Sequence, residues 1–292
     1  MNIVAALTRI CLCVLCGESA YAQQAPPDTR TQVIAGVEAQ RDRFQYHFDN
    51  PSSFDTPAPV PHFFEQRYVA DNIWAVVTIR YTARLRWETS LGATPQRTAT
   101  ADDYDTFFDP DGTVWVSGTT GGVAVRSFRI SQTAEVARAR GVRFVAGYRL
   151  RVDLADFQVG HKTETRNGVV VLAADVTSPE TTTSQLREVV AGAGTSLNIR
   201  PHGDPHWRLS IDGELTPLSI GRLAVRLPEK YADAVVFSAR VAGASARVTL
   251  ARHHVRWPVE LTLDGGRTWS YKSDARLADD RFGVRVAVGR AW

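Results

Sequence analysis

The stretch that decides the fold is 73-IWAVVTIRYTARLRWETSLGAT-94, in which apolar residues recur at every second position. From Ile73 to Leu91 one parity is mostly apolar, whereas the other is rich in arginine, threonine and serine. A period of two predicts a β-strand with one apolar and one polar face. The run exceeds the usual strand of about 5–6 residues, and it would cross a bilayer, which takes roughly 9–11 residues of tilted strand.

Nine further segments alternate in the same way, so that ten strands and an all-β fold are predicted. The nine are residues 43–49, 64–70, 128–137, 142–157, 186–200, 206–217, 234–250, 257–271 and 281–292. The apolar parity of residues 234–250 changes phase near Gly243, which predicts a β-bulge there. No apolar run of about 18 residues occurs, so a transmembrane helix is excluded.

The connections between these strands alternate in length. The short ones are residues 71–72, 138–141, 201–205 and 251–256, and the longer ones are 51–61, 95–126, 161–184, 227–233 and 272–280. Short turns on one side and long loops on the other are typical of outer-membrane barrels. The sequence therefore predicts a ten-stranded antiparallel up-and-down transmembrane β-barrel. An even number of strands puts both chain ends on the periplasmic side, where Trp292 would end the closing strand at the membrane interface.

Which face of each strand points outward depends on whether the barrel is surrounded by lipid or by water. Across a membrane the apolar parity of each strand is expected to face lipid and the charged parity the lumen. Tryptophans near strand ends suit the aromatic girdles at the two interfaces; they are Trp74, Trp87, Trp207, Trp257 and Trp269. The alternative is a secreted, soluble β-sandwich that binds a ligand, in which the same tryptophans form a core.

Large side chains of both charges fall on the predicted inward parity. They are Arg80, Arg84, Arg86, Glu88, Arg129, Glu135, Arg143, Arg149, Arg151, Asp153, Asp212, Glu214, Arg240, Glu260 and Asp264. Ten strands make a narrow barrel, and a porin-like channel takes about 16–18. We therefore predict a salt-bridged, plugged lumen, with a selective pore as the alternative.

The N-terminal segment is typical of a signal peptide. Arg9 precedes a short apolar stretch, and Ala20-Tyr21-Ala22 forms a small-x-small cleavage site. The predicted organisation is a signal peptide over 1–22, a flexible lead-in over 23–32 and an outer-membrane barrel over 33–292. All three cysteines lie in the first segment. A lipid anchor at Cys16 is disfavoured by the bulky residues before it, and an uncleaved cytosolic N-terminus is the alternative.

The net charge and the predicted location limit the classes of partner that the protein can have. The formal charge of +3 is too small to indicate nucleic acid. We expect a monomer in the outer membrane of a Gram-negative bacterium, in contact with outer-membrane lipid including lipopolysaccharide. Arginines near the outer rim are suited to lipid phosphates.

Acidic residues cluster in the predicted loop 95–126, within the segment 102-DDYDTFFDPDG-112. Three interpretations stay open. The segment could be a hairpin with Asp109-Pro110-Asp111-Gly112 as a type I turn. Asp105, Asp109 and Asp111 could instead bind Ca²⁺, the divalent cation that clustered loop carboxylates favour. It could also be a solvated acidic loop without a ligand.

Asp103-Tyr104-Asp105 resembles the Asp-x-Asp element of the omptin proteases, which are ten-stranded outer-membrane barrels. The resemblance implies that Asp103 and Asp105 polarise a catalytic water on one wall of an extracellular cleft. In that family an Asp-x-His dyad stands on the opposite wall, which here corresponds to residues 219–240. That stretch contains Asp233 and no histidine. We therefore expect a surface-recognition or structural role without catalysis or a cofactor, and an omptin-like endopeptidase is the alternative.

Overall fold

The computed structural model describes residues 30–49, 62–83, 86–176, 181–201, 206–226, 234–252, 257–271 and 275–292. The predicted signal peptide lies outside them. The described chain forms twelve strands: β1 (Arg30–Asp49), β2 (His62–Thr82), β3 (Arg86–Ala93), β4 (Arg97–Phe108), β5 (Val114–Ala139), β6 (Val142–Arg166), β7 (Val169–Val176), β8 (Thr181–Ile199), β9 (Trp207–Arg226), β10 (Val235–Arg252), β11 (Val259–Ser270) and β12 (Ala275–Ala291). Among these residues, no helix is long and apolar enough to cross a bilayer.

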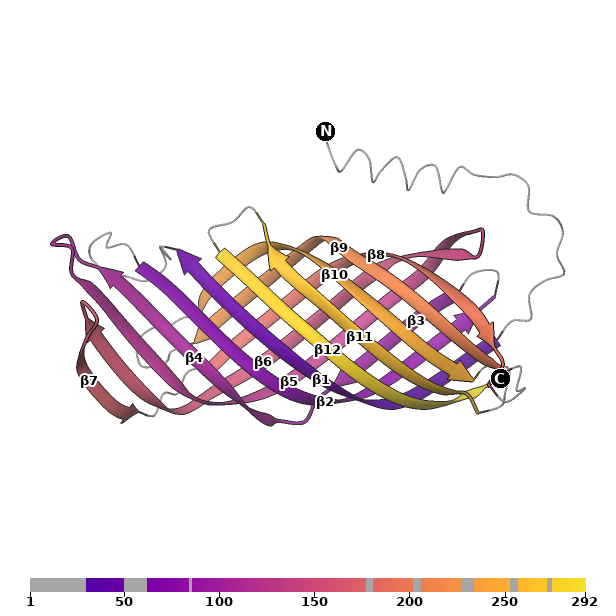
Figure 1. Cartoon of the computed structure of the whole chain (residues 1–292), viewed down its shortest axis with the longest axis horizontal. Helices are drawn as coiled ribbons and strands as arrows, with labels where there is room; N and C mark the ends of the chain where they lie inside the picture. Colours follow the sequence, from indigo (N-terminus) through magenta and orange to yellow (C-terminus); the bar gives the residue numbers. More distant parts are fainter. Residues whose placement is uncertain are drawn as a thin grey trace, which may run out of the picture.

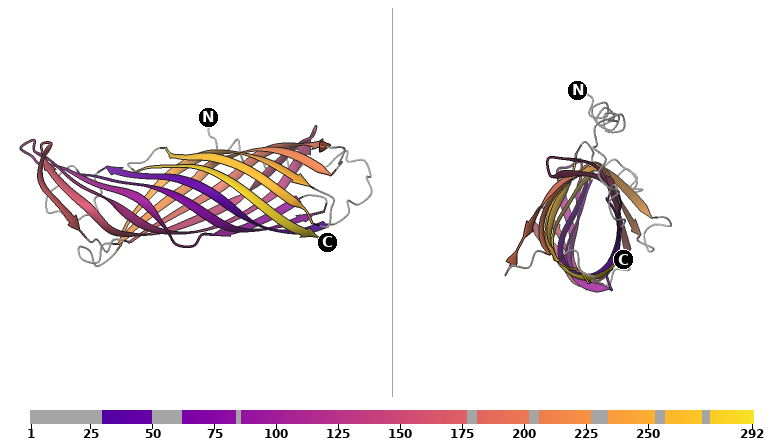
Figure 2. Two further views of the ribbon diagram at one scale, coloured as in Figure 1. Left: turned by 60° about the horizontal axis from the view of Figure 1, so that its bottom comes forward. Right: turned by 90° about the vertical axis from the view of Figure 1, so that its right-hand side faces the viewer.

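The strands form a closed antiparallel ring with ten positions (Figure 1). Twelve strands fill ten positions because β3 and β4 share the place between β2 and β5, while β7 and β8 both pair with β6. Pairing of β1 with β12 and of β5 with β6 closes the ring, as the end-on view of Figure 2 shows. The predicted ten-stranded up-and-down barrel is confirmed. Closure leaves no unpaired edge inside a bilayer, where each unpaired backbone group would cost several kcal/mol.

Both described chain ends lie on the side of the barrel with short connections. Thr31 and Trp292 exchange two backbone hydrogen bonds of 3.3 and 3.0 Å. Arg140 and Gly141 join β5 to β6 on the same side, and their φ angles are 48° and 82°. Positive φ at both central positions defines a type I′ turn, which matches the twist of a hairpin. The turn predicted at residues 138–141 is therefore confirmed.

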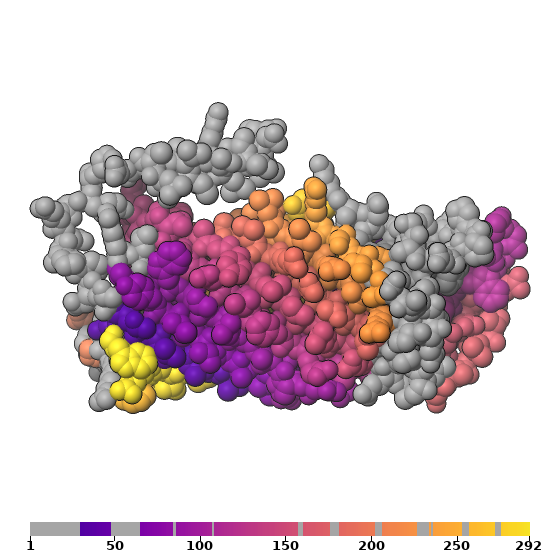
Figure 3. All heavy atoms as spheres, turned by 180° about the vertical axis from the view of Figure 1, so that it is seen from behind, coloured from indigo at the N-terminus to yellow at the C-terminus, as the bar shows by residue number. Residues whose placement is uncertain are grey.

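Three predicted connections are wrong. Residues 71–72 lie inside β2, which runs without a break from His62 to Thr82, and the turn falls instead between β2 and β3. The predicted loop 95–126 contains β4 and the outer part of β5, and the loop 161–184 contains the end of β6 and all of β7. The strands are longer than their apolar alternation because they continue outward beyond the apolar belt. These four strands project at one end of the molecule, opposite the C-terminal residues (Figure 3).

The part of the barrel next to the chain ends, here called the lower tier, has the polarity predicted for a membrane protein. On β2 its outward residues run from Ile73 to Tyr81, and both ends of this run are more than a third exposed. The equivalent residues of other strands include Val37, Leu91, Phe128, Tyr148, Val189, Ile220, Val248, Leu261, Phe282, Val286 and Val288. Between them point buried polar residues such as Arg80 and Glu260. An apolar belt around a polar interior is the arrangement of a barrel in lipid.

Farther out, in the upper tier, the polarity inverts along the same strands. On β1 the outward residues change to arginine, glutamine and histidine from Arg41 onward, while Phe44 and Tyr46 point inward and are buried. Ion pairs on the outside mark the change: Arg41–Asp71 at 3.6 Å, Arg126–Asp156 at 3.7 Å and Arg267–Asp280 at 3.3 Å. The upper tier is thus built like a soluble β-barrel, with a polar outside and an apolar inside.

This inversion corrects several side-chain predictions. Tyr68 and Ala70 share the apolar parity of their strand but face the interior, as Phe44 and Tyr46 do. Trp74, predicted in an aromatic girdle, is fully buried in the lumen. Trp87, Trp257, Trp269 and Trp292 are outward and exposed as predicted.

Residues of β10 show why the inversion was missed. Arg240, predicted in the lumen, is exposed on the outside because it lies in the upper tier, opposite inward-facing Phe237 and Val241. A register shift against β9 lies between Val241 and Gly243, near the predicted bulge. The extra residue is on β9, however, and β10 itself alternates without a break. The phase change in the sequence also marks the level at which apolar side chains switch from the inside to the outside.

The boundary between the tiers predicts unequal effects of charge on one face of β1. Val37→Arg, in the apolar belt, is expected to destabilise the folded barrel by about 2–4 kcal/mol, the cost of a cation on the lipid face. Gln45→Arg, on the same face in the upper tier, should change stability by less than about 0.5 kcal/mol. Urea titration of folding into lipid vesicles measures both. Equal effects of the two variants would contradict the assigned boundary.

Candidate functional site

The lower-tier lumen is filled by ion pairs that join strands across the barrel. The two terminal nitrogens of Arg129 on β5 donate to the two oxygens of Glu38 on β1 at 2.8 and 2.6 Å. Arg80 on β2 bridges Glu88 at 2.9 Å and Glu260 at 2.5 Å. Glu88 is the register partner of Arg80 on the neighbouring strand β3. The Arg129–Glu38 and Arg80–Glu260 pairs instead join strands that do not hydrogen-bond to each other.

Arg149 and Arg143 of β6 extend this network toward β8 and β9. Arg149 donates to Glu214 at 2.5 Å and to Glu188 at 3.3 Å. Arg143 donates to Asp212 at 2.5 Å. Charge-assisted contacts of this kind are the strong hydrogen bonds of proteins. The predicted salt bridges of the lumen are therefore present.

Arg151 lies where the two tiers meet and contacts three carboxylates. Its terminal nitrogens donate to both oxygens of Asp42 at 3.0 Å, and its Nε donates to Asp153 at 3.0 Å. Asp279 lies 3.7 Å from the guanidinium. Asn72 also donates to Asp42, at 2.8 Å. All of these side chains are almost fully buried, so the cluster depends on its internal pairing.

Sequence reasoning missed about a third of the luminal charges. The missed residues are Glu38, Asp42, Glu188, Arg247, Asp279, Arg281 and Arg285. They alternate with outward residues on β1, β8, β10 and β12. Glu38, Asp42 and Asp279 lie outside the stretches that were used to assign parity, and extending β1 and β12 by their period of two would have found them. The other four lie inside those stretches, on the polar parity.

An apolar layer closes the lumen above Arg151. It consists of Phe44, Tyr46, Tyr68, Ala70, Ala99, Ala101, Val123, Val125, Ala155, Leu186, Leu223, Val225, Phe237, Ala239, Val241 and Leu277. The Tyr46 hydroxyl lies 2.7 Å from the Ser184 hydroxyl. Burial raises the pKa of both Tyr46 and Tyr68 well above the ordinary range. Trp74 joins the two layers, since the guanidinium groups of Arg129 and Arg151 lie 4.5 and 5.6 Å from its ring centre.

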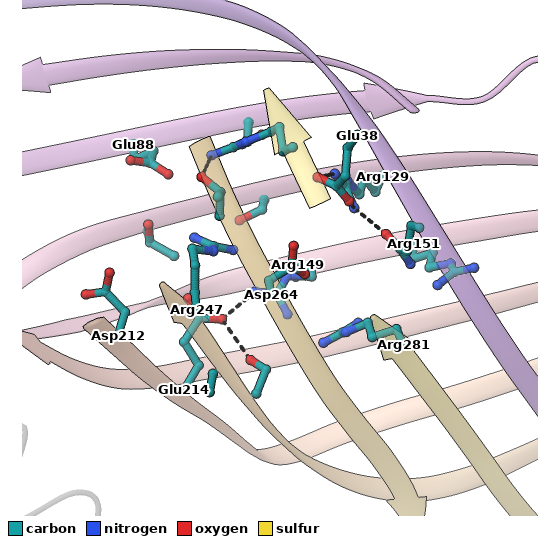
Figure 4. Close-up of a pocket in the computed structure, with 18 residues that line it drawn as sticks. Glu38, Glu88, Arg129, Arg149, Arg151, Asp212, Glu214, Arg247, Asp264 and Arg281 are labelled. Carbon is teal, nitrogen blue, oxygen red and sulfur yellow. Dashed lines mark hydrogen bonds and ion pairs between the residues drawn. The ribbon is translucent and has the colours of Figure 1, made fainter. Parts of the chain in front are cut away.

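A cavity lies among the charged side chains of the lower tier (Figure 4). Its volume is about 70 Å³, and Glu38, Arg129, Arg149, Glu214 and Arg247 are among its lining residues. At about 10–15 Å³ of such volume for each water molecule, it holds on the order of five waters. This volume suits trapped water in a polar network and is too small for a metabolite.

Asp103 and Asp105 lie on the inner wall of the barrel mouth. They share the parity of Ala99 and Ala101, which are buried in the apolar layer below them. In register, Asp103 pairs with Thr119 on β5, which in turn pairs with Lys162 on β6. The predicted acidic pair is therefore brought together on one face, above the apolar layer.

No described histidine side chain lies with this acidic pair. His161 follows Thr120 in register and so points to the opposite face of the sheet from Lys162. It contacts Asp175 on β7, at 3.0 Å between Nδ1 and a carboxylate oxygen. His47 faces outward and lies 3.4 Å from Glu65, and His206 lies beside β9 near the chain ends. Asp233 lies outside the residues that the structure describes, and so does the side chain of His62.

Asp109 and Asp111 form a tight turn, which confirms the hairpin interpretation of this segment. The N–H of Gly112 donates to the Asp109 carbonyl at 3.0 Å, and Gly112 has a φ of 84°. The Trp115 indole donates to the Asp109 carboxylate at 2.8 Å. The Thr113 N–H donates to Asp111 at 2.9 Å and lowers the pKa of that carboxyl.

Both turn carboxylates are thus engaged within the hairpin, and Asp105 lies apart on the inner wall. Within the part of the chain that the structure describes, no group of three or more acidic, histidine or cysteine side chains could hold a metal ion. The Ca²⁺ site stays a prediction, which this geometry does not favour.

Arginines just above the apolar belt fall into two groups. Arg41, Arg126 and Arg267 pair with carboxylates of neighbouring strands. Arg187 on β8 and Arg240 on β10 flank Ile220 of β9 in register, and Arg222 lies two residues along from Ile220. Among the described residues these three, here called the arginine triad, have no carboxylate within 4.0 Å, and Arg187 contacts only the Gln185 amide, at 3.4 Å. The triad is exposed at the level expected for lipid head groups.

Comparison with known proteins supports the fold. No protein-family model and no curated protein sequence matches the chain. Among solved structures, the outer membrane protease OmpT from Escherichia coli is similar, with a TM-score of 0.64 at 9% identity over 94% of this chain and 99% of OmpT. The translocator domain of the autotransporter NalP from Neisseria meningitidis matches with a TM-score of 0.34 at 9% identity, over 98% of this chain and 96% of that one. The Pseudomonas putida toluene transporter TodX matches with 0.24 at 8% identity, over 90% of each chain.

The last two scores are too low to carry an argument, and the likeness to OmpT concerns the fold alone. The fold is that of an outer-membrane β-barrel with ten strands, as the alternation in the sequence predicted. The soluble β-sandwich is excluded because the strands form one closed ring with an apolar exterior belt.

The Arg151 cluster predicts a large loss of stability when one partner is removed. Arg151→Met leaves Asp42, Asp153 and Asp279 buried without their cation, and is expected to cost about 3–5 kcal/mol. Arg126→Met breaks an exposed pair with a single contact of 3.7 Å and should cost less than about 1 kcal/mol. Urea unfolding in detergent micelles measures both variants. A small effect of Arg151→Met would show that the cluster does not hold the tiers together.

Proposed function

We propose that this chain is a sealed outer-membrane barrel that acts at the cell surface through its projecting strands β4–β7, in a recognition or structural role without catalysis. The observation that carries the proposal is the double closure of the lumen. A network of ion pairs fills the lower tier and an apolar layer fills the upper tier. Transport through the barrel would require both to rearrange. We place the protein in the outer membrane of a Gram-negative bacterium, reached through the predicted signal peptide.

The alternative of an omptin-like endopeptidase has one supporting feature, the inward Asp103 and Asp105. A carboxylate pair alone does not activate water efficiently, because the reaction needs a general base within hydrogen-bond reach of the water. The described histidines face elsewhere, and the connection between β9 and β10 carries none in its sequence. The geometry therefore favours recognition over proteolysis.

Electrical recording tests the sealed lumen. The protein inserted into planar bilayers is expected to give no steady unitary conductance at moderate salt. A variant in which large side chains of both layers are replaced by small ones carries Tyr46→Ala, Phe237→Ala, Arg149→Ser and Arg151→Ser. It should give detectable current and serves as the control for insertion. Heat-modifiable migration in gels verifies that both proteins are folded. Regular conductance steps from the unaltered protein would overturn the proposal.

The lipid partner of the barrel is proposed to contact it at the arginine triad. Neighbouring strands lie about 4.7–4.9 Å apart, so three long guanidinium side chains from β8, β9 and β10 can converge on one anion. Lipid phosphates of the outer leaflet, including those of lipopolysaccharide, lie at this height. Arginine binds phosphate through forked, charge-assisted hydrogen bonds.

The triad predicts selective loss of lipid binding. Arg187→Gln, Arg222→Gln and Arg240→Gln together should weaken binding of bisphosphorylated lipid A at least tenfold, since three charge-assisted contacts are lost. The matched control combines Arg41→Gln, Arg126→Gln and Arg267→Gln, whose arginines already have partners. Native mass spectrometry with lipid A, a dephosphorylated lipid A and inorganic phosphate separates a lipid site from a simple anion site. Equal losses in the two triple variants would contradict the assignment.

A further inference from the structure

The β6–β7 hairpin ends the sheet with a strand that has only one neighbour. Among the described strands, β7 pairs with β6 and with no other. It lies at the end of the molecule far from the C-terminus (Figure 1). One row of backbone N–H and C=O groups along β7 therefore has no partner among the described strands, and such an edge can accept a further strand.

The side chains of β7 are apolar where the surrounding surface is polar. Val169, Val170, Val171 and Leu172 are 66%, 57%, 53% and 42% exposed. Adjacent positions on a strand point to opposite faces, so both faces of the edge are apolar. The hairpin lies beyond the Arg126–Asp156 pair that bounds the apolar belt on β5 and β6, so lipid does not account for this surface.

Proteins usually protect such an edge with lysine, proline or a strong bulge. Residues 169–174 contain no charged residue and no proline. One bulge lies near Val171, where the pairing with β6 shifts between Glu164 and Thr165. An apolar edge with so little protection is typical of a surface that a partner covers.

The edge is held in place before any partner binds. Asn167 and Gly168 form a type I′ turn, with φ angles of 49° and 79°. The Asn167 side chain accepts a hydrogen bond from the Val114 N–H at 2.8 Å, and the Asn167 N–H donates to the Val114 carbonyl at 2.8 Å. The Arg166 guanidinium lies 5.1 Å from the Trp115 ring centre. These contacts fix the tip of the β6–β7 hairpin to the start of β5, which reduces the entropy lost on binding.

We infer that β7 binds an extended apolar segment of another protein by strand addition. The backbone edge supplies hydrogen bonds and the apolar side chains select alternating apolar residues, which is the mode called β-augmentation. Charge at the two ends sets the direction: Arg166 lies at the turn end and exposed Asp175 at the other. The partner segment has an acidic residue toward Arg166 and a basic residue toward Asp175.

The size of the edge favours a peptide over a second copy of this chain. Eight residues of strand extend about 27 Å at roughly 3.4 Å each. A stable dimer buries about 1,200–2,000 Å² in total, more than one strand edge supplies. Recognition of a short segment needs only a weak, reversible contact of this kind. The inference names the partner of the proposed recognition role and so rests on it, but it does not depend on whether the lumen conducts.

Two synthetic peptides test the inference. The antiparallel probe is Lys-Val-Thr-Val-Thr-Val-Thr-Glu, the parallel probe is the same with its terminal charges exchanged, and each carries a fluorophore. The full chain in detergent micelles is expected to raise the anisotropy of at least one probe. Val170→Lys with Leu172→Lys should weaken that binding at least tenfold. The control, Thr163→Lys with Thr165→Lys on doubly paired β6, should change it less than twofold.

Hydrogen exchange gives the second readout. Bound probe is expected to protect amides of β7 and to leave the other strands unchanged. The inference is overturned if neither probe binds, if the β7 variant binds as well as the control, or if β7 is already protected in a dimer without probe. Since conductance is recorded separately, a failed strand addition and a failed sealed lumen are distinguishable outcomes.

Discussion

The constraint on which the rest of the structure depends is the neutralisation of buried arginines inside a closed ring. A barrel in lipid turns its apolar residues outward, so that the polar residues of every strand are forced into a narrow interior. Ten strands leave no room to hydrate them fully. Carboxylates from facing strands, such as Glu38 and Glu260, therefore take the place of water. In a wide barrel such luminal charges would line a conducting channel. In this narrow barrel they pair with each other and hold the strands together.

The same strands pass through two tiers that have different surroundings. The lower tier has lipid outside and ion pairs inside, whereas the upper tier has water outside and an apolar layer inside. Arg151 and Trp74 lie at the level where these interiors meet, and each contacts the charged layer from a buried position. Because the upper tier carries its own core, strands β4–β7 can extend far beyond the membrane without support from lipid. A rigid platform for surface contacts follows from this arrangement.

The outer surface carries two features that the membrane does not require. Among the described residues the arginine triad has no carboxylate partners of the kind that other arginines have at the same height, and β7 keeps an apolar edge far from the belt. One is suited to an anion and the other to an extended chain. Both differ in chemistry from a proteolytic cleft, although the inward Asp103 and Asp105 occupy the same mouth.

The sequence by itself determined the period of two, the ten-position ring, the short turn at residues 138–141 and the charged lumen, since each follows from local alternation or turn chemistry. Only the tertiary structure decided which parity faces inward at each height. An alternating strand fits either solvent, so Tyr46 and Trp74 could be placed only once the level of the membrane boundary on the ring was known. The partners of each arginine also depend on register across the barrel, which no local pattern contains. Among the described strands β7 has no second neighbour because β8 and β9 end below it, and strand ends are set by three-dimensional pairing.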